Sequence, residues 1–218
     1  MKDFSNKPVV VLGAGGHAKV IAETLGLAGR QILGFLSPDN DPHTPFLNST
    51  ILGADDVIER YSPGEIDLVN GVGALPQQDL RWRLAAEMRA KGHCFATIIH
   101  PTATISDQAH LDEGVQVMAG VIVQTGSYIG KDTILNTGVI VDHDCRIDEN
   151  CHLAPGVVCS GGVRVKRGVH VGTGSALIQN ISIGSGTVLA AGSVIYRDIP
   201  EKVVFKQSRQ ENLDFIGE

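Results

Sequence analysis

A histidine flanked by two carboxylates is the first feature of this sequence that could carry out chemistry. The segment VDHDC places His143 between Asp142 and Asp144. An imidazole titrates near neutral pH, so it can take a proton from a nucleophile. A neighbouring carboxylate can fix its tautomer and stabilise its protonated form. The triplet is therefore a candidate general base, and the sequence leaves open which carboxylate contacts the ring.

A glycine loop near the start of the chain is the second candidate. Residues 13–18 read Gly-Ala-Gly-Gly-His-Ala, which matches the pattern G-x-G-x-x-A. Between a strand and a helix, the backbone amides of such a loop can bind phosphate. Dinucleotide enzymes share the pattern, so an NAD-dependent sugar oxidoreductase is one alternative. Against it, the segment is short for a full dinucleotide fold and lacks a convincing acidic residue at the end of the second expected strand.

The elements that must position this loop alternate between strands and helices. We expect strands within residues 7–16, 31–36, 66–73 and 94–99, and helices within residues 17–29, 54–61 and 77–92. Such alternation predicts a parallel sheet covered by helices. Its length corresponds to half of a doubly wound fold, so residues 1–100 are predicted to form an α/β half-Rossmann (βαβ) domain.

A strict period of six residues replaces this alternation after residue 101. Starting at Ile105, every sixth residue up to Ile195 is aliphatic in fifteen of sixteen cases, and the exception is Cys159. Three residues further on, the series from Gln108 to Asp198 is Gly, Asp or Asn in fifteen of sixteen cases. A parallel β-helix of hexapeptide strands has this period, with aliphatic residues inside and left-handed backbone at the corners. We expect it to span residues 101–200, followed by a tail at 201–218.

These patterns together resemble a known family. The segments VVVLGAGGHAKVIAETL and VDHDCRI and the hexapeptide register are similar to the sialic acid O-acetyltransferase and nucleotide-amino-sugar N-acetyltransferase family over nearly the whole chain. The resemblance implies a left-handed β-helix with triangular coils of three hexapeptides. It also implies acetyl-CoA as cosubstrate and N-acetylation of the 4-amino group of a UDP- or GDP-linked 4-amino-4,6-dideoxy sugar. O-acetylation of a sialic acid is the alternative within the family.

The resemblance also assigns roles to individual residues. His143 matches the catalytic base, and Asp144 matches the acidic residue that modulates it, with Asp142 as a competing candidate. The resemblance implies contacts with acetyl-CoA at four positions: His152, Gly161, Thr173 and Ala191. At a coil length of eighteen residues, Gly161 lies beside His143, where its amide could stabilise an oxyanion.

The resemblance assigns the glycine loop to the nucleotide of the sugar substrate. The expected contacts come from the loop and from the end of the second strand: Gly13, Gly15, Gly16, His17, Ser37 and Asp39. Relatives specific for uridine often read Phe-Leu-Asp-Asp at this strand end, whereas this chain reads Phe-Leu-Ser-Pro-Asp at residues 35–39. Two acidic acceptors are therefore missing, and the sequence does not decide between a uracil and a guanine nucleotide.

One outward column of the expected coil is apolar throughout. It consists of Ile122, Ile140, Val158, Ala176 and Val194. A solvated stripe of this kind is unfavourable, so we expect it to be buried between subunits of a homotrimer, as in the family. The alternative is cover by the chain's own tail. His152 lies half a coil from His143, so the two can approach each other only across a subunit interface.

Composition narrows the remaining classes of function, partner and cellular location. The net charge is −6 and no block of basic residues occurs, which argues against nucleic acid or membrane partners. No apolar run could span a bilayer and no leader opens the chain, so we expect a cytoplasmic protein. The four cysteines form no CxxC pair, and the histidine spacing does not match the three-histidine zinc sites of some β-helix enzymes, so no metal is expected. A non-catalytic β-helix is the least favoured class.

Overall fold

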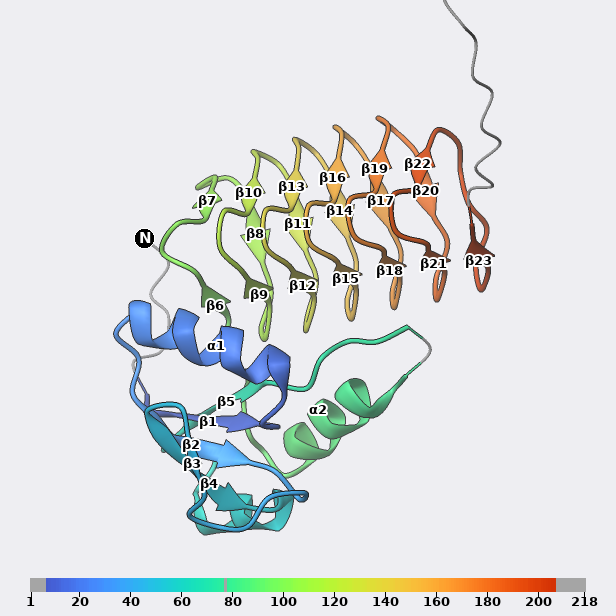
Figure 1. Cartoon of the computed structure of the whole chain (residues 1–218). Helices are drawn as coiled ribbons and strands as arrows, with labels where there is room; N and C mark the ends of the chain where they lie inside the picture. Colours follow the sequence, from blue (N-terminus) through green and yellow to red (C-terminus); the bar gives the residue numbers. More distant parts are fainter. Residues whose placement is uncertain (1–6, 77, 207–218) are drawn as a thin grey trace, which may run out of the picture.

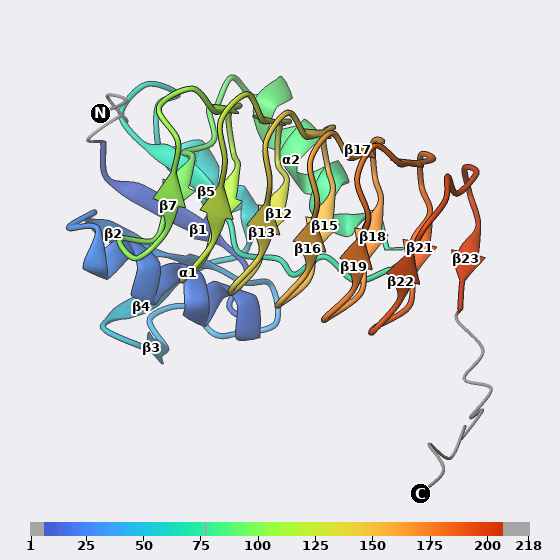
Figure 2. The same ribbon diagram turned by 90° about the horizontal axis from the view of Figure 1, so that it is seen from above.

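The computed structural model describes residues 7–76 and 78–206 as two parts that lie side by side (Figure 1). An N-terminal α/β domain packs along one long side of a solenoid, which Figure 2 shows from above. The predicted combination of an α/β half-domain and a parallel β-helix is confirmed. Within the described residues, no helix has the length and apolar character needed to cross a membrane.

The N-terminal domain is built on a five-stranded sheet with the order β3-β4-β2-β1-β5. Its pairs are parallel except for β3 with β4. The strands are β1 (Val9–Leu12), β2 (Ile32–Leu36), β3 (Pro45–Phe46), β4 (Ser49–Gly53) and β5 (Asp67–Asn70). The helices are α1 (Gly16–Leu27), the 3-10 helix η1 (Asp55–Arg60) and α2 (Leu80–Ala90). β1 is fully buried and leads directly into the glycine loop at the N-terminus of α1.

Two features of this domain differ from the prediction. The expected fourth strand at residues 94–99 is not a strand of this sheet: Phe95 forms only an isolated bridge to Leu68, and β6 (Ile98–Ile99) pairs with a solenoid strand instead. This apolar segment therefore begins beside the N-terminal sheet, at Phe95, and ends in the first strand of a solenoid sheet, at Ile98 and Ile99. The β3–β4 hairpin was not predicted, because two residues of β3 are too few to produce a period.

The solenoid consists of three parallel sheets, one for each side of a triangular coil. The β13 face comprises β7 (Thr104–Ile105), β10 (Ile122–Val123), β13 (Ile140–Val141), β16 (Val158–Cys159), β19 (Ala176–Leu177) and β22 (Val194–Ile195). The β14 face comprises β8 (His110–Leu111), β11 (Tyr128–Ile129), β14 (Arg146–Ile147), β17 (Arg164–Val165) and β20 (Ser182–Ile183). The β15 face comprises β6, β9 (Gln116–Val117), β12 (Ile134–Leu135), β15 (His152–Leu153), β18 (His170–Val171), β21 (Val188–Leu189) and β23 (Val204–Phe205).

Stacking of equivalent residues defines the coil. Ile122 pairs with Ile140, and Ile140 pairs with Val158, so partners are eighteen residues apart. The predicted inward aliphatic residues form one continuous buried core. Corners carry the left-handed backbone that the glycine series predicted, and non-glycine residues such as Asp132 and Asp144 adopt it as well.

The solenoid strands run from Ile98 to Phe205. The proposed division into residues 1–100, 101–200 and 201–218 stays a prediction, and residues 207–218 of the tail lie outside the described residues.

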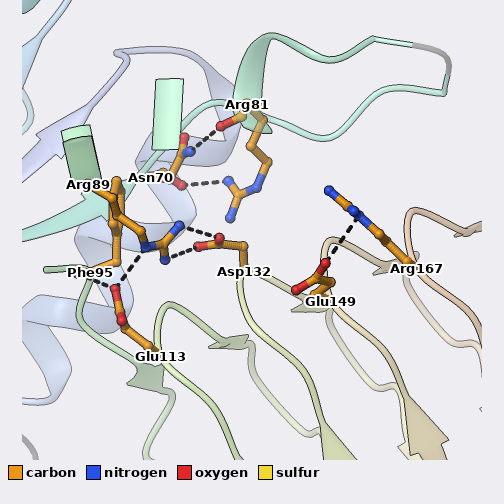
Figure 3. Close-up of polar contacts among 8 residues, drawn as sticks. All are labelled: Asn70, Arg81, Arg89, Phe95, Glu113, Asp132, Glu149 and Arg167. Atoms are coloured by element: carbon orange, nitrogen blue, oxygen red, sulfur yellow. Dashed lines mark hydrogen bonds and ion pairs between the residues drawn. The ribbon is translucent and has the colours of Figure 1, made fainter. Parts of the chain in front are cut away.

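The N-terminal domain is attached to the β15 face and to the corner beside it. Arg89 of α2 donates hydrogen bonds to both carboxylate oxygens of Asp132, at 2.7 and 3.0 Å, and to Glu113 at 3.1 Å (Figure 3). Its guanidinium also lies 4.6 Å from the ring centroid of Phe95. Only 6% of the Asp132 side chain is exposed. This arginine therefore neutralises a buried carboxylate that the solenoid presents to the domain.

Removing this arginine tests the attachment. Arg89→Met should lower the free energy of unfolding by about 1–3 kcal/mol, because it leaves the buried carboxylate of Asp132 without its partner. Arg167→Met is the matched control: its ion pair with Glu149 lies nearby (Figure 3) but is largely exposed, so the loss should be about 0–1 kcal/mol. Urea unfolding measures both. Equal losses would contradict the buried role of the Arg89 pair.

Candidate active site

The His143–Asp144 pair lies at the corner between β13 and β14. The His143 Nδ1 atom is 2.9 Å from Oδ2 of Asp144, whereas Asp142 accepts only the backbone N–H of His143, at 2.7 Å. Asp144 has a left-handed backbone with φ of 57°, and its amide donates to the carbonyl of Thr125 one coil earlier. The corner geometry therefore turns Asp144, and not Asp142, toward the ring.

The electrostatics of the pair suit a base. The hydrogen bond that His143 donates to Asp144 raises the pKa of His143, and the charge of Asp142 raises this pKa further. In the neutral ring, Nδ1 carries the proton that is donated to Asp144, so Nε2 is left as the proton acceptor. More than half of each side chain is exposed in the single chain. His143 can therefore take a proton from a substrate that approaches from outside the solenoid.

Gly161 makes room for the imidazole. A Cβ atom added to Gly161 would lie 2.5 Å from His143 Nε2 and 2.6 Å from Cε1. Its neighbour Gly162 donates its amide to the carbonyl of His143 at 2.9 Å, which fixes the two corners against each other. The predicted proximity of Gly161 and His143 is thus seen in the structure. Any side chain at residue 161 would displace the ring from its place beside Asp144.

His152 belongs to the contact between domains. Its Nδ1 donates to the carbonyl of Ala74 at 3.0 Å, and its Nε2 lies 3.2 Å from the amide nitrogen of Asn136. Burial, and to a smaller extent His170, whose ring centroid lies 4.9 Å away, lower the pKa of His152 to about 4. Both ring nitrogens are therefore engaged within the chain. His152 pins the segment that follows Gly73 to the β15 face, and its proposed contact with acetyl-CoA stays a prediction.

Thr173 and Ala191 lie one above the other at another corner. They occupy equivalent positions between the β15 and β13 faces, and the amide of Gly192 donates to the carbonyl of Thr173 at 2.8 Å. Both residues are exposed. This corner and the corner of His143 form the two edges of the β13 face. Within one chain, the structure does not bring Thr173 and Ala191 together with Gly161.

All six residues predicted to contact the nucleotide line one pocket of about 530 Å³. They are Gly13, Gly15, Gly16, His17, Ser37 and Asp39. Its volume falls in the range of small-ligand sites. Gly13 has φ of 89°, and the Ser37 hydroxyl accepts a hydrogen bond from Asn40 at 2.7 Å. The glycine loop, the end of β2 and the segment after β5 thus form one concave site at the N-terminus of α1.

The pocket and the base lie on opposite sides of the solenoid. The N-terminal domain contacts the β15 face through Gln116 and His152. In a triangular coil, the corner between the β13 and β14 faces, which carries His143, lies opposite the β15 face. The structure therefore brings the six residues predicted to contact the nucleotide into one group, and His143, Asp144 and Gly161 into another. Within one chain, the two groups are far apart.

Sequence reasoning missed the buried polar residues that support the pocket. Gln116 donates to the carbonyl of Asn70 at 2.8 Å, and Arg81 donates to the same carbonyl at 2.7 Å (Figure 3). One signal was present: Gln116 is a polar residue in an outward column between Ile98 and Ile134. Within the described residues, no cluster of three or more histidine, cysteine or acidic side chains could hold a metal ion.

Comparisons with known proteins cover both parts of the chain. Residues 8–88 match the PglD N-terminal domain, and residues 126–161 match the bacterial transferase hexapeptide repeat. No curated protein matches the sequence.

Solved structures match nearly the whole chain. The acetyltransferase domain of PglB from Neisseria gonorrhoeae, in complex with acetyl coenzyme A, is 34% identical, with a TM-score of 0.83, over 90% of this chain and 94% of that chain. A perosamine N-acetyltransferase variant from Caulobacter crescentus, in complex with CoA and GDP-perosamine, is 36% identical, with a TM-score of 0.82, over 91% and 92%. WeeI from Acinetobacter baumannii, at 20% identity, shares the fold with a TM-score of 0.77 over 89% and 93%.

Replacing each aspartate beside His143 tests the pairing. Asp144→Asn should lower the pKa of His143, because it removes the hydrogen bond that contributes most to the raised value. Asp142→Asn should lower this pKa less, because Asp142 acts on the ring through its charge alone. NMR titration of the His143 ring measures both variants. If the pKa of His143 fell more in Asp142→Asn than in Asp144→Asn, Asp142 and not Asp144 would be the partner of the ring.

Proposed function

This chain belongs to the PglD-type family of hexapeptide-repeat acetyltransferases, and from that premise we propose that it transfers the acetyl group of acetyl-CoA to the 4-amino group of a nucleotide-linked 4-amino-4,6-dideoxy sugar. The observation that carries the proposal is the exposed His143–Asp144 pair above Gly161, in a chain that also contains a pocket with a phosphate-binding loop. The similarity to the perosamine N-acetyltransferase, over both domains, supports an amino sugar as acceptor.

His143 acts as the general base of this reaction. As the sugar amine attacks the thioester carbonyl, Nε2 of His143 takes the proton that the nitrogen loses, and Asp144 stabilises the resulting imidazolium. A carbon–nitrogen bond forms and the carbon–sulfur bond breaks, so coenzyme A leaves and receives a proton. The amide of Gly161 is the proposed donor to the carbonyl oxygen as negative charge develops on it.

The nucleotide binds in the pocket at the N-terminus of α1. Backbone amides at Gly15 and Gly16 and the helix dipole favour the phosphates. Ser37 and Asp39, which follow β2 and line the same pocket, are the proposed contacts for the base or ribose. Ser37 and Asp39 do not reproduce the paired acidic acceptors of uridine-specific relatives. Both UDP and GDP sugars are therefore candidate substrates.

In a homotrimer, the nucleotide pocket of one subunit would serve the His143 corner of a neighbour, because the two lie on opposite sides of the solenoid within one chain. The outward residues of the β13 face from Ile122 to Val194 are apolar, and two of them, Val158 and Val194, are 37% and 47% exposed in the single chain. Packing this face against a neighbouring subunit would bury the apolar column. Its two edges carry His143 with Gly161 and Thr173 with Ala191, so around a threefold axis one edge meets the other edge of the neighbour. The acetyl-CoA cleft would then form between subunits.

Thiol release tests the proposed reaction. The protein is incubated with acetyl-CoA and a panel of UDP- and GDP-linked 4-amino sugars, and free coenzyme A is followed with a thiol reagent. We expect release with at least one amino sugar and none with its 4-hydroxy analogue. Release with sialic acid and with no amino sugar would instead indicate the O-acetyltransferase activity.

A charge on the apolar column tests the trimer. Ile140→Glu should dissociate the assembly and abolish activity together, because the interface would bury an unpaired carboxylate. Arg164→Glu, an exposed outward substitution on the neighbouring β14 face, is the matched control and should leave the trimer intact. Analytical ultracentrifugation at micromolar concentration gives the mass. A wild-type monomer, or an active Ile140→Glu monomer, would refute the arrangement.

Removal of His143 tests the base. His143→Ala should lower kcat by about 10²–10⁴-fold and leave acetyl-CoA binding and assembly unchanged. His110→Ala is the matched control, since His110 is also exposed and lies 2.9 Å from a carboxylate, that of Asp112, but on the β14 face. Steady-state kinetics across pH decide the role. Full recovery of the His143→Ala rate at alkaline pH would show that His143 only orients the amine.

A further inference from the structure

A chain of buried hydrogen bonds crosses from the solenoid to the glycine loop. Gln116 of β9 is 1% exposed, and its Nε2 donates to the carbonyl of Asn70 at 2.8 Å. Its Oε1 lies 2.8 Å from Nε2 of His17. A backbone carbonyl can only accept, so the amide nitrogen of Gln116 must face Asn70, and its oxygen must face His17. The His17 Nε2 atom is therefore the one that carries the proton.

The orientation of Gln116 is fixed from the other side by Arg81. The same Asn70 carbonyl accepts a hydrogen bond from Nη1 of Arg81 at 2.7 Å (Figure 3). This nitrogen also donates to the carbonyl of Val72 at 2.7 Å. Arg81 is 2% exposed. A rotated Gln116 amide would place its oxygen against the Asn70 carbonyl, with no donor between the two oxygens. The buried arrangement therefore permits one orientation of the amide.

His17 stays neutral in this setting. Burial, and to a smaller extent the charge of Arg81, lower its pKa to about 4, although the hydrogen bond with Gln116 acts in the opposite direction. The other titratable group near it is His152, which is itself held neutral, with a pKa of about 4. A neutral ring with a proton on Nε2 has a bare lone pair on Nδ1. Within the described residues, Nδ1 has no hydrogen-bond partner, and His17 lines the nucleotide pocket whereas Gln116 does not.

We propose that Gln116 is a positioning residue that holds His17 as the Nε2–H tautomer, so that the pocket presents Nδ1 as an obligatory hydrogen-bond acceptor to the nucleotide sugar. This inference rests on the proposed function for the identity of the ligand. A bare lone pair repels a phosphate oxygen and matches an N–H or O–H group of the base, ribose or sugar. The amides of Gly15 and Gly16 then bind the phosphates, and Nδ1 of His17 accepts a hydrogen bond from a donor group of the nucleotide sugar.

Nitrogen NMR of histidine-labelled protein tests the tautomer without any substrate or activity. We expect His17 to show a protonated Nε2 and an unprotonated Nδ1 between about pH 5 and pH 8. The same state should persist when UDP or GDP is titrated into the pocket. A protonated Nδ1 in the free protein, or a doubly protonated ring in the UDP or GDP complex, would overturn the proposal, since the ring would then act as a donor. These outcomes do not depend on whether the chain acetylates an amino sugar.

Kinetics of Gln116→Ile test the consequence for the substrate. Isoleucine matches Ile98 and Ile134 above and below in the same column, so the fold should be retained. We expect KM for the nucleotide sugar to rise by up to about tenfold, with kcat and KM for acetyl-CoA unchanged. In a His17→Ala background the same substitution should have no further effect, because Gln116 acts through His17. Additive losses in the double variant would show a merely structural role and overturn the proposal.

Discussion

The eighteen-residue register of the solenoid is the constraint on which the site depends. Each strand pairs with the strand one coil away, at a spacing of about 4.8 Å, so any side chain lies directly beside the residue eighteen positions further along. This register places Gly161 under His143 and His170 against His152. The same register carries the apolar column along the β13 face. The geometry of the candidate site is thus set by the backbone hydrogen bonding of the solenoid.

Polar contacts between the N-terminal domain and the solenoid hold the glycine loop in place. Two groups of polar contacts, all partly or fully buried, do this: Arg89 with Asp132 and Glu113, and Gln116 with Asn70 and His17. Both join residues far apart in sequence. A buried arginine at residue 81 completes the second group. The proposed nucleotide pocket is therefore held in place partly by a residue of the solenoid.

Sequence reasoning succeeded where the chain repeats and failed where it does not. The six-residue period predicted the inward core, the corners and the proximity of His143 and Gly161, because each follows from counting along one register. It could not choose between Asp142 and Asp144, since the choice depends on the left-handed backbone of Asp144 and the direction of its side chain. It missed the contact of His17 with Gln116, which spans 99 positions, and it did not foresee that Ile98 and Ile99 pair with the solenoid.

The central claim is that a working site takes His143 from one subunit and the nucleotide pocket from another. Complementation tests it most directly. His143→Ala removes the base, and Gly15→Trp fills the pocket at a position where an added Cβ meets no atom within 4 Å. Each variant alone should be inactive as a homotrimer, and trimers that contain both subunits should regain activity, because some sites then combine an intact base with an intact pocket. Mixed trimers that form but show no acetyl transfer would contradict the account.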